Sequence, residues 1–478
     1  MLNATYPATL KSRTVLVLGL GDSGLATVRW LRAQGARVRV ADTRMQPPHA
    51  EVLQREAPEV ELLTGPFTRA SFEGQSLIVA SPGVPLAEPE VAAALARGQE
   101  VVGDVELFAR TLRSLPQPPQ VVAITGANGK TTVTTMVGEM VRAAGFNTAV
   151  IGNIGTPVLA ALNTEKPAEV YVLELSSFQL ETTQNLELRA ATVLNITEDH
   201  LDRYADMDAY TAAKARIFAH CQQRVLNRED PRSLAMAVPG AITFGLDAPP
   251  TARDWGLGDG CRLGTDPDIP NTANDDGQPW ICCGATPVMD LATLPLNGRH
   301  NAANAMAALA LCDALGIPRP VSVQALQSFK GLPHRVERVA SVAGVTYFDD
   351  SKGTNVGATV AALTGMTTPV VLIAGGDGKG QDFAPLQAAL ARHARALVLI
   401  GRDAPRIAAA VAGCAVPIVH AADMGDAVRQ AARLAQPADA VLMSPACASF
   451  DMFNNYLHRA EVFIAAVQAL QQKAGERA

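Results

Sequence analysis

The sequence has few of the features that mark secreted, membrane-spanning or nucleic-acid-binding proteins. Seven cysteines are scattered over 478 residues without a C-x-x-C pair, so we expect reduced cysteines, no disulfide framework and no thiolate metal site. The first residues lack the apolar segment of a signal peptide, and no apolar run approaches the roughly 18 residues of a membrane span. We therefore expect a cytoplasmic protein without membrane insertion. Lys and Arg number 40 against 46 Asp and Glu, which is the wrong sign for a general nucleic-acid binder.

Length and periodicity predict three α/β domains in series. A chain of 478 residues with 48% hydrophobic residues can bury several cores. Short β-branched runs alternate with helical patterns throughout, as in parallel sheets covered by helices. Three prolines in the seven residues 114–120 indicate a linker, and a second boundary is expected near 333. We expect a Rossmann-like domain at 1–117, a P-loop domain at 118–333 and a Rossmann-like domain at 334–478, with an exposed excursion at 265–279.

The first glycine-rich turn, at 19–24, follows an apolar run and precedes a helical pattern. Its sequence G-L-G-D-S-G matches the dinucleotide fingerprint, and Asp42 ends the next strand. This arrangement places backbone close to a diphosphate at a helix N-terminus. NAD fits it, but so does any nucleoside diphosphate, and a purely structural turn also remains possible.

The second glycine-rich loop is more specific. T-G-A-N-G-K-T-T at 125–132 lies between a buried strand and a helix, where a P-loop belongs. Ile124 stands where the standard spacing has its first glycine, so this is the shorter G-x-N-G-K-T form. Backbone N–H groups and Lys130 would bind phosphates, and the Thr131 hydroxyl would help to hold Mg²⁺. The loop predicts an ATP site.

Acidic side chains gather after the next strands. Glu174 lies in an apolar strand, where a charge is costly unless it is paired or metal-bound. Glu198, Asp199, His200 and Asp202 follow another strand, at the edge where α/β sheets collect ligands. These groups suit Mg²⁺, although a helix N-cap cluster is the plainer alternative. Lys214, in a helix, is expected from the sequence alone to be a solvated lysine.

Three loops of the last domain follow predicted strands. D-D-S-K-G-T-N spans 349–355, G-G-D-G-K-G-Q-D-F spans 375–383 and S-P-A-C-A-S-F-D spans 444–451. Backbone donors with Lys352 or Lys379 fit the recognition of an anion. Each loop taken alone could be an ordinary turn, but together they indicate a shared pocket.

In their order, these motifs resemble the Mur ligase family, ATP-dependent enzymes that add amino acids to the peptidoglycan precursor. The resemblance also rests on G-N-I-G at 152–155, E-L-S-S-F-Q-L at 174–180, H-N-A-A-N at 300–304 and L-P-H-R at 332–335. D-S-K-G-T-N stands where other members have Tyr-(Ala/Gly)-His, and it looks like the D-glutamate-adding branch. The resemblance implies formation of an acyl phosphate on UDP-N-acetylmuramoyl-L-alanine and attack on it by D-glutamate.

The resemblance also implies roles for individual residues. Contacts to the UDP-sugar are expected from Asp22, Ser23, Asp42, Thr43, Arg44, Ser81 and Asn153. The ATP site is expected to comprise Gly126, Ala127, Asn128, Gly129, Lys130, Thr131, Thr132, Asn301, Asn304, His334, Arg335 and Asp350. The D-glutamate pocket is expected to comprise Lys352, Thr354, Lys379, Ser449 and Phe450, with Tyr456 on its wall. Two Mg²⁺ ions are expected near Thr131, Glu174, His200 and Lys214, the last as a CO₂-derived carbamate. Lys130, His200 and Lys214 are expected to serve catalysis, in a chain that acts as a monomer and binds no nucleic acid.

Two alternatives remain at this point. A folate-type polyglutamate ligase shares the logic of the central domain, but it does not begin with a UDP-binding glycine domain. A nicotinamide-dependent oxidoreductase or a nucleotide-binding regulatory protein would explain the first turn. Neither of these would explain Glu174, the 197–204 cluster or Lys214.

Overall fold

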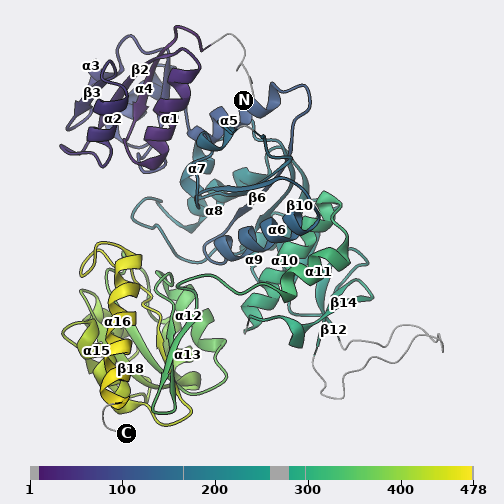
Figure 1. Cartoon of the computed structure of the whole chain (residues 1–478), viewed down its shortest axis with the longest axis vertical. Helices are drawn as coiled ribbons and strands as arrows, with labels where there is room; N and C mark the ends of the chain where they lie inside the picture. The colour runs from purple at the N-terminus through teal and green to yellow at the C-terminus, as the bar shows by residue number, and fades with distance from the viewer. Residues whose placement is uncertain (1–9, 165, 259–278, 297, 476–478) are drawn as a thin grey trace.

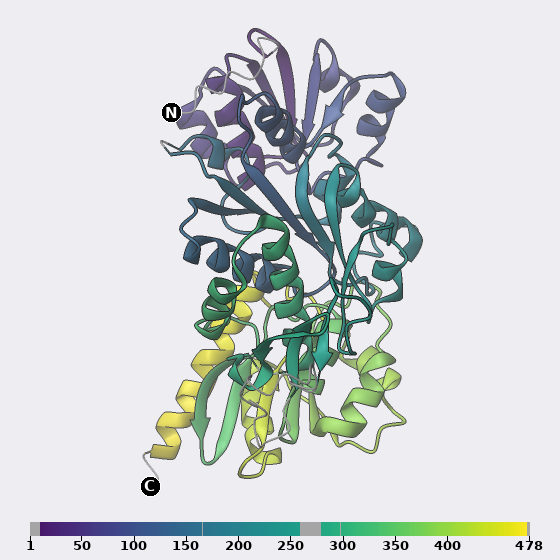
Figure 2. The same ribbon diagram turned by 90° about the vertical axis from the view of Figure 1, so that its right-hand side faces the viewer.

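A computed structural model describes residues 10–164, 166–258, 279–296 and 298–475. Three α/β bodies follow one another along the molecule (Figure 1), and a view from the side shows the same succession (Figure 2). The predicted fold class is confirmed. The excursion expected at 265–279 lies, except for Pro279, outside the described residues.

The first body is a parallel sheet in the order β3-β2-β1-β4-β5, which follows the strand order of the Rossmann fold. Its elements are β1 (Thr14–Leu18), α1 (Asp22–Ala33), β2 (Arg37–Asp42), α2 (Ala50–Glu56), β3 (Glu61–Thr64), α3 (Arg69–Phe72), β4 (Leu77–Ala80), α4 (Pro89–Ala96), β5 (Val101–Val102) and α5 (Asp104–Arg113). The topology switches between β1 and β4, so the loops after β1, β2 and β4 meet at one edge of the sheet.

Helix α5 packs on the central sheet, although it follows the first one in the chain. Phe108 stacks edge-to-face on Tyr171 with ring centroids 5.1 Å apart. The buried carboxylate of Glu106 accepts hydrogen bonds from the N–H groups of Gln184 and Asn185 at 2.7 and 2.9 Å. The boundary expected near 117 falls after this helix and remains a prediction.

The central body is a nine-stranded sheet in the order β14-β13-β12-β11-β10-β9-β6-β8-β7, and among the described residues it is parallel except that β13 pairs antiparallel with both β12 and β14. Its strands are β6 (Gln120–Thr125), β7 (Thr148–Gly152), β8 (Val170–Glu174), β9 (Leu188–Val193), β10 (Cys221–Asn227), β11 (Ile242–Phe244), β12 (Trp255–Gly258), β13 (Trp280–Cys283) and β14 (Thr286–Asp290). Its helices are α6 (Lys130–Ala143), η1 (Ala160–Leu162), α7 (Ser177–Glu181), α8 (Met207–Ala215), η2 (Arg216–Phe218), α9 (Pro231–Leu234), η3 (Leu291–Thr293), α10 (Arg299–Leu315) and α11 (Arg319–Gln327). Strand β9 ends at Val193, because the next residues turn to contact the P-loop.

The third body is a six-stranded sheet in the order β15-β16-β20-β17-β18-β19, parallel except for β15. Its elements are β15 (Glu337–Val342), β16 (Val345–Asp349), α12 (Val356–Thr364), β17 (Val370–Gly375), α13 (Pro385–His393), β18 (Ala394–Ile400), α14 (Ala404–Ala410), β19 (Ile418–His420), α15 (Met424–Leu434), β20 (Ala440–Met443) and α16 (Tyr456–Gly475). Strands β16, β20 and β17 are neighbours, so the three loops singled out in the sequence leave the same edge of this sheet.

No helix in the described parts of the chain is both long enough and apolar enough to span a membrane.

Candidate active site

A pocket of about 600 Å³ opens at the carboxyl ends of β1, β2 and β4. Every residue expected to contact the UDP-sugar lines it, namely Asp22, Ser23, Asp42, Thr43, Arg44, Ser81 and Asn153. The glycine turn fits tightly here, because a Cβ on Gly24 would lie 2.0 Å from the carbonyl oxygen of Gly19. The first two bodies thus share one pocket, since Asn153 belongs to the central body.

Asp42 is buried at the base of this pocket, and its carboxylate is fully engaged. It accepts hydrogen bonds from the Leu20 N–H at 2.7 Å and from the Arg44 guanidinium at 2.6 and 2.9 Å. Burial raises the pKa of Asp42, but these hydrogen bonds outweigh it and the net pKa lies below the ordinary value. The acid therefore holds Arg44, whose side chain is half exposed at the pocket, in place for an anionic group.

The P-loop at 126–132 joins β6 to α6 as the sequence predicts. Gly129 has φ +81°, and a Cβ there would lie 2.7 Å from Oδ1 of Asn304. The side chain of Asn195 accepts from the Asn128 N–H at 2.8 Å and donates to the Asn128 carbonyl at 3.1 Å. Within the described residues the N–H groups of 129–132 have no protein acceptor. Such an open helix N-terminus can bind phosphate oxygens.

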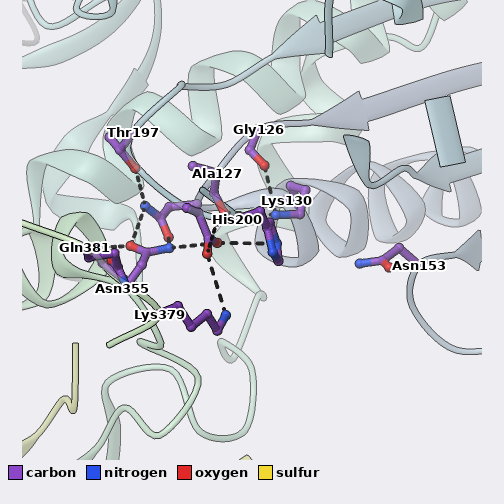
Figure 3. A network of polar contacts seen from close by, with 12 residues as sticks. Gly126, Ala127, Lys130, Asn153, Thr197, His200, Asn355, Lys379 and Gln381 are labelled. Carbon is purple, nitrogen blue, oxygen red and sulfur yellow. Dashed lines mark hydrogen bonds and ion pairs between the residues drawn. The ribbon is translucent and has the colours of Figure 1, made fainter. Parts of the chain in front are cut away.

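Two lysine side chains meet at the carbonyl of Gly126, and Figure 3 shows one of them, Lys130, beside Gly126. Lys130 Nζ and Lys214 Nζ each donate to it at 2.9 Å. The expectation of a solvated Lys214 is wrong, because α8 buries this side chain to 2% exposure and places its Nζ 4.6 Å from the Tyr210 ring centre. Burial lowers the pKa of Lys130, and it lowers the pKa of Lys214 well below the usual value, as does the charge of Lys130.

Glu174 supplies the negative charge at the end of β8. It is 2% exposed, and its Oε1 accepts from Asn153 Nδ2 at 2.9 Å. Its Oε2 is buried and has no hydrogen-bond partner among the described residues. An orphaned carboxylate oxygen in a buried setting is what a divalent cation would satisfy. Asn153 also connects this group to the UDP-sugar pocket.

His200 and Asp199 follow β9 on the same side. His200 packs on Phe178 with ring centroids 4.8 Å apart, and its Nε2 lies 3.6 Å from Asp199 Oδ2. Burial lowers the pKa of His200, and nearby lysines lower it further against the effect of Asp199. A neutral imidazole can bind a metal. Asp199 is buried whereas Asp202 is exposed, so the structure separates the two acids that the sequence presents together.

A cleft of about 280 Å³ lies between the central and third bodies. Its lining includes Asn128, Gly129, Thr132, Asn301, Asn304, Arg335 and Asp350 from the expected ATP set. An adjoining cavity of about 780 Å³ shares Asn301 and Arg335 with it. Arg335 donates to the Thr131 hydroxyl at 2.7 Å. Burial raises the pKa of Asp350 to about 7, although hydrogen bonding from Ser444 opposes the shift.

The other five expected ATP residues are not in the lining of this cleft, namely His334 and the P-loop residues Gly126, Ala127, Lys130 and Thr131. His334 is held at the end of β16. Its Nδ1 is 2.7 Å from Asp349 Oδ2, which fixes the ring against the end of β16.

The expected D-glutamate residues leave the carboxyl ends of β16, β17 and β20. Lys352 is an exposed residue, but desolvation by the groups around it lowers its pKa to about 8, as does the nearby charge of Arg335. Its Nζ lies 3.9 Å from the Tyr456 ring centre. Lys379 Nζ lies 3.6 Å from Asp199 Oδ1. Ser449 is buried, whereas Phe450 is 74% exposed. Thr354 is half-buried.

Four polar residues near these pockets were not singled out in the sequence. Gln179, Thr197 and His300 line the pockets, and Asn355 is hydrogen-bonded to Asn128, which lines one of them. All four lie within motifs that were recognised, so their neighbours in the sequence were the available signal. What the sequence does not show is which of them points to a partner from another body.

Comparison with known families accounts for all three bodies. The Mur ligase MurD-like N-terminal domain matches residues 13–103, the Mur ligase middle domain matches 124–312, and the Mur ligase glutamate ligase domain matches 334–447. The chain belongs to the Mur ligase family. Its family membership confirms the resemblance that the motifs indicated.

Individual relatives cover nearly the whole chain. A UDP-N-acetylmuramoylalanine--D-glutamate ligase of Methylobacillus flagellatus is 56% identical over 97% of this chain and 98% of its own. The enzyme of the same name from Thiobacillus denitrificans is 56% identical over 96% and 97% of the two chains. Among solved structures, the UDP-N-acetylmuramate-alanine ligase MurC of Thermotoga maritima matches with a TM-score of 0.59 and 18% identity, over 95% of this chain and 99% of that one. At that identity the likeness shows the fold alone.

Proposed function

We propose that this chain is an ATP-dependent ligase that joins D-glutamate to UDP-N-acetylmuramoyl-L-alanine, giving UDP-N-acetylmuramoyl-L-alanyl-D-glutamate, ADP and phosphate, in peptidoglycan precursor synthesis. Full-length relatives at 50–56% identity carry the name of this activity. The structural observation that carries the proposal is the continuity of the three sites. Glu174 contacts Asn153 of the UDP-sugar pocket, and Asp199 contacts Lys379 of the third body.

The chemistry follows from the substrate. A carboxylate is a poor acyl donor, so its oxygen first attacks the γ-phosphorus of ATP and ADP leaves. The amine nitrogen of D-glutamate then attacks the acyl carbon, the tetrahedral intermediate expels phosphate, and the nitrogen loses a proton. Both steps bring anions together, and the half-buried Lys130 of the P-loop is placed to offset that charge.

We assign the metal sites to Thr131, Glu174, His200 and Lys214, for two Mg²⁺ ions. The orphaned Oε2 of Glu174 and the neutral His200 suit hard divalent cations. Bound magnesium would polarise the transferred phosphoryl group and offset its charge. Family membership supports ATP and magnesium, while the number of ions and their ligands are part of the proposal.

We assign Lys214 as the carbamate-bearing residue. A lysine reacts with CO₂ only as the neutral amine: Nζ bonds to the carbon, a C=O electron pair moves to oxygen, and one amine proton passes to solvent. The buried, pKa-lowered amine of Lys214 meets this requirement. The product would replace the amine beside Gly126 with an anionic oxygen ligand.

We assign the pocket residues to the UDP-sugar, ATP and D-glutamate as the family resemblance implies. The UDP-sugar set lines one pocket, seven members of the ATP set line another, and the five D-glutamate residues lie on loops of neighbouring strands. Domain boundaries near 117 and 333 and a cytoplasmic location complete the proposal. The nicotinamide alternative is set aside because the first body matches a Mur ligase domain, and the folate-type ligase is set aside because full-length relatives carry the D-glutamate ligase name.

The test is phosphate release from ATP and Mg²⁺ with UDP-N-acetylmuramoyl-L-alanine and either D- or L-glutamate. We expect release that requires both substrates and strongly prefers the D-isomer. Release with another amino acid would retain the Mur ligase reaction and overturn the third-body assignment. Folded protein that releases no phosphate would contradict the function itself.

A further inference from the structure

A pair of amide side chains, Asn128 and Asn355, joins the central and third bodies, and Figure 3 shows Asn355 near Thr197 and Gln381. Asn355 Nδ2 donates to Asn128 Oδ1 at 3.0 Å, and Asn128 Nδ2 donates to Asn355 Oδ1 at 3.2 Å. Asn355 is only 3% exposed. Each amide therefore uses both its donor and its acceptor on the other, an arrangement that other side chains of this size cannot reproduce.

On the central side, the pair ends at the phosphate loop. Asn128 immediately precedes the open N-terminus of α6, and its backbone is held on both sides by Asn195. Its Nδ2 also lies 3.3 Å from the Thr197 hydroxyl. A shift of the Asn128 side chain would thus move the loop that positions the transferable phosphates.

On the other side, the pair ends at the amino-acid loops. Asn355 directly follows Thr354 and caps α12 by accepting from the Ala358 N–H at 2.9 Å. The next N–H, of Val356, donates to Gln381 Oε1 at 3.0 Å, and Gln381 Nε2 donates to the Gly378 carbonyl at 3.0 Å. The loops that carry Lys352 and Lys379 are therefore tied to each other and to Asn355.

Gly357 supplies an independent observation. It lies in the first turn of α12 without a positive φ, so its backbone does not require glycine. A Cβ there would lie 3.0 Å from the Thr197 hydroxyl and 3.2 Å from Asn128 Nδ2. Glycine in a helix costs about 1 kcal/mol relative to alanine, and here it leaves room for the amide pair.

We propose that Asn355 is a positioning residue that, through its amide pair with Asn128, couples the amino-acid loops of the third body to the geometry of the phosphate loop. This inference rests on the proposed ligase function. It assigns Asn355 no contact with substrate. The neighbouring cross-body contact between Lys379 and Asp199 is ionic and weakens with salt, whereas the neutral amide pair does not.

The test separates the pair from the helix cap. Asn355→Ser keeps a capping oxygen but is too short to reach Asn128. Asp423→Ser is the matched control, because Asp423 is an exposed cap of α15 in the same body. We expect Asn355→Ser to lower kcat/KM for D-glutamate at least tenfold. Its melting temperature should differ from that of the wild type no more than the melting temperature of the control does. We expect Gly357→Ala to lower kcat/KM for D-glutamate as well, because its Cβ would crowd the side chain of Asn128.

A double-mutant cycle shows whether the two amides act as one unit. We expect the double variant Asn128→Ala, Asn355→Ser to have a kcat/KM for D-glutamate no lower than that of the more impaired single variant. The proposal would be overturned if the fold-losses in kcat/KM of the two single variants multiplied in the double variant. Wild-type kinetics for Asn355→Ser would also overturn it. Small-angle scattering of the ligand-free variant should show a larger radius of gyration than the wild type and the control, and an unchanged radius would also overturn it. Scattering needs no turnover, so a failure of the ligase function itself would appear separately, as absent phosphate release by the wild type.

Discussion

Replacing Asp104 with asparagine should stabilise the protein at neutral pH and not at acid pH. Asp104 begins α5 and is 3% exposed, and its Oδ1 accepts from the Val105 N–H at 2.9 Å. Burial raises the pKa of Asp104 to about 6, while hydrogen bonding from that N–H and from Ser23 opposes the shift only in part. Asparagine retains an acceptor oxygen, and its NH₂ can donate to the Ser23 hydroxyl.

The sign and size follow from linkage. The folded state binds the proton of Asp104 more tightly than the unfolded chain, in which the pKa is 3.8. The contribution of this group to the free energy of unfolding therefore falls as pH rises from about 4 to about 6. The shift of about 2 units corresponds to about 3 kcal/mol when the titration is complete. Between pH 5 and pH 8 the advantage of Asp104→Asn over the wild type should grow by about 1.4 kcal/mol.

The assay is urea unfolding of the wild type and Asp104→Asn at several pH values from 5 to 8. The quantity compared is the free energy of unfolding for the cooperative transition in which α5 unfolds. Asp423→Asn serves as the control, because it changes an exposed helix-capping acid and should give a difference that does not vary with pH. A difference for Asp104→Asn that is constant with pH, or that shrinks as pH rises, would refute the reasoning that burial dominates this carboxyl.

Three further outcomes are expected at the sites. Lys214→Ala should lower turnover by roughly 100-fold or more, because it removes the proposed carbamate ligand, while ADP affinity in calorimetry stays near the wild-type value; an active variant would contradict the carbamate. Arg44→Ala should raise KM for the UDP-sugar by roughly tenfold or more, the value of a lost charge-assisted hydrogen bond, and should leave KM for D-glutamate unchanged; the reverse pattern in steady-state kinetics would displace the first pocket. With the Lys352 pKa at about 8, the cation that would hold a carboxylate is lost as pH rises from 7 to 9, so D-glutamate affinity should fall over that window. Lys352→Ala should bind more weakly and flatten that dependence, and an identical slope in the variant would exclude Lys352 as its source.

The sequence predicted the features that a short segment determines through its own backbone. The P-loop was recognisable because glycine at 129 meets a left-handed conformation between a buried strand and a helix. The edge at which the third-body loops meet was also predictable, because parallel strands bring their carboxyl ends together. Both predictions depend on the spacing of strands and helices along the chain and on the positions of glycine, which the sequence shows directly.

Burial and pairing between distant segments could not be obtained in that way. Lys214 has the sequence surroundings of a solvated helical lysine. Its 2% exposure arises because α8 places the side chain against the P-loop, where its Nζ donates to the Gly126 carbonyl. Helix α5 follows the first sheet in the chain yet packs on the second, since Phe108 and Glu106 find their partners there.

By itself, then, the sequence determined three α/β bodies, their phosphate-binding turns and the family to which they belong, because each depends on local periodicity and on motif order. The tertiary structure alone decided which charged groups lose their water and which amides of different bodies meet, as Asn128 and Asn355 do although 227 residues apart. The environment of a side chain is the sum of atoms contributed by several elements, and no segment of the sequence contains that sum.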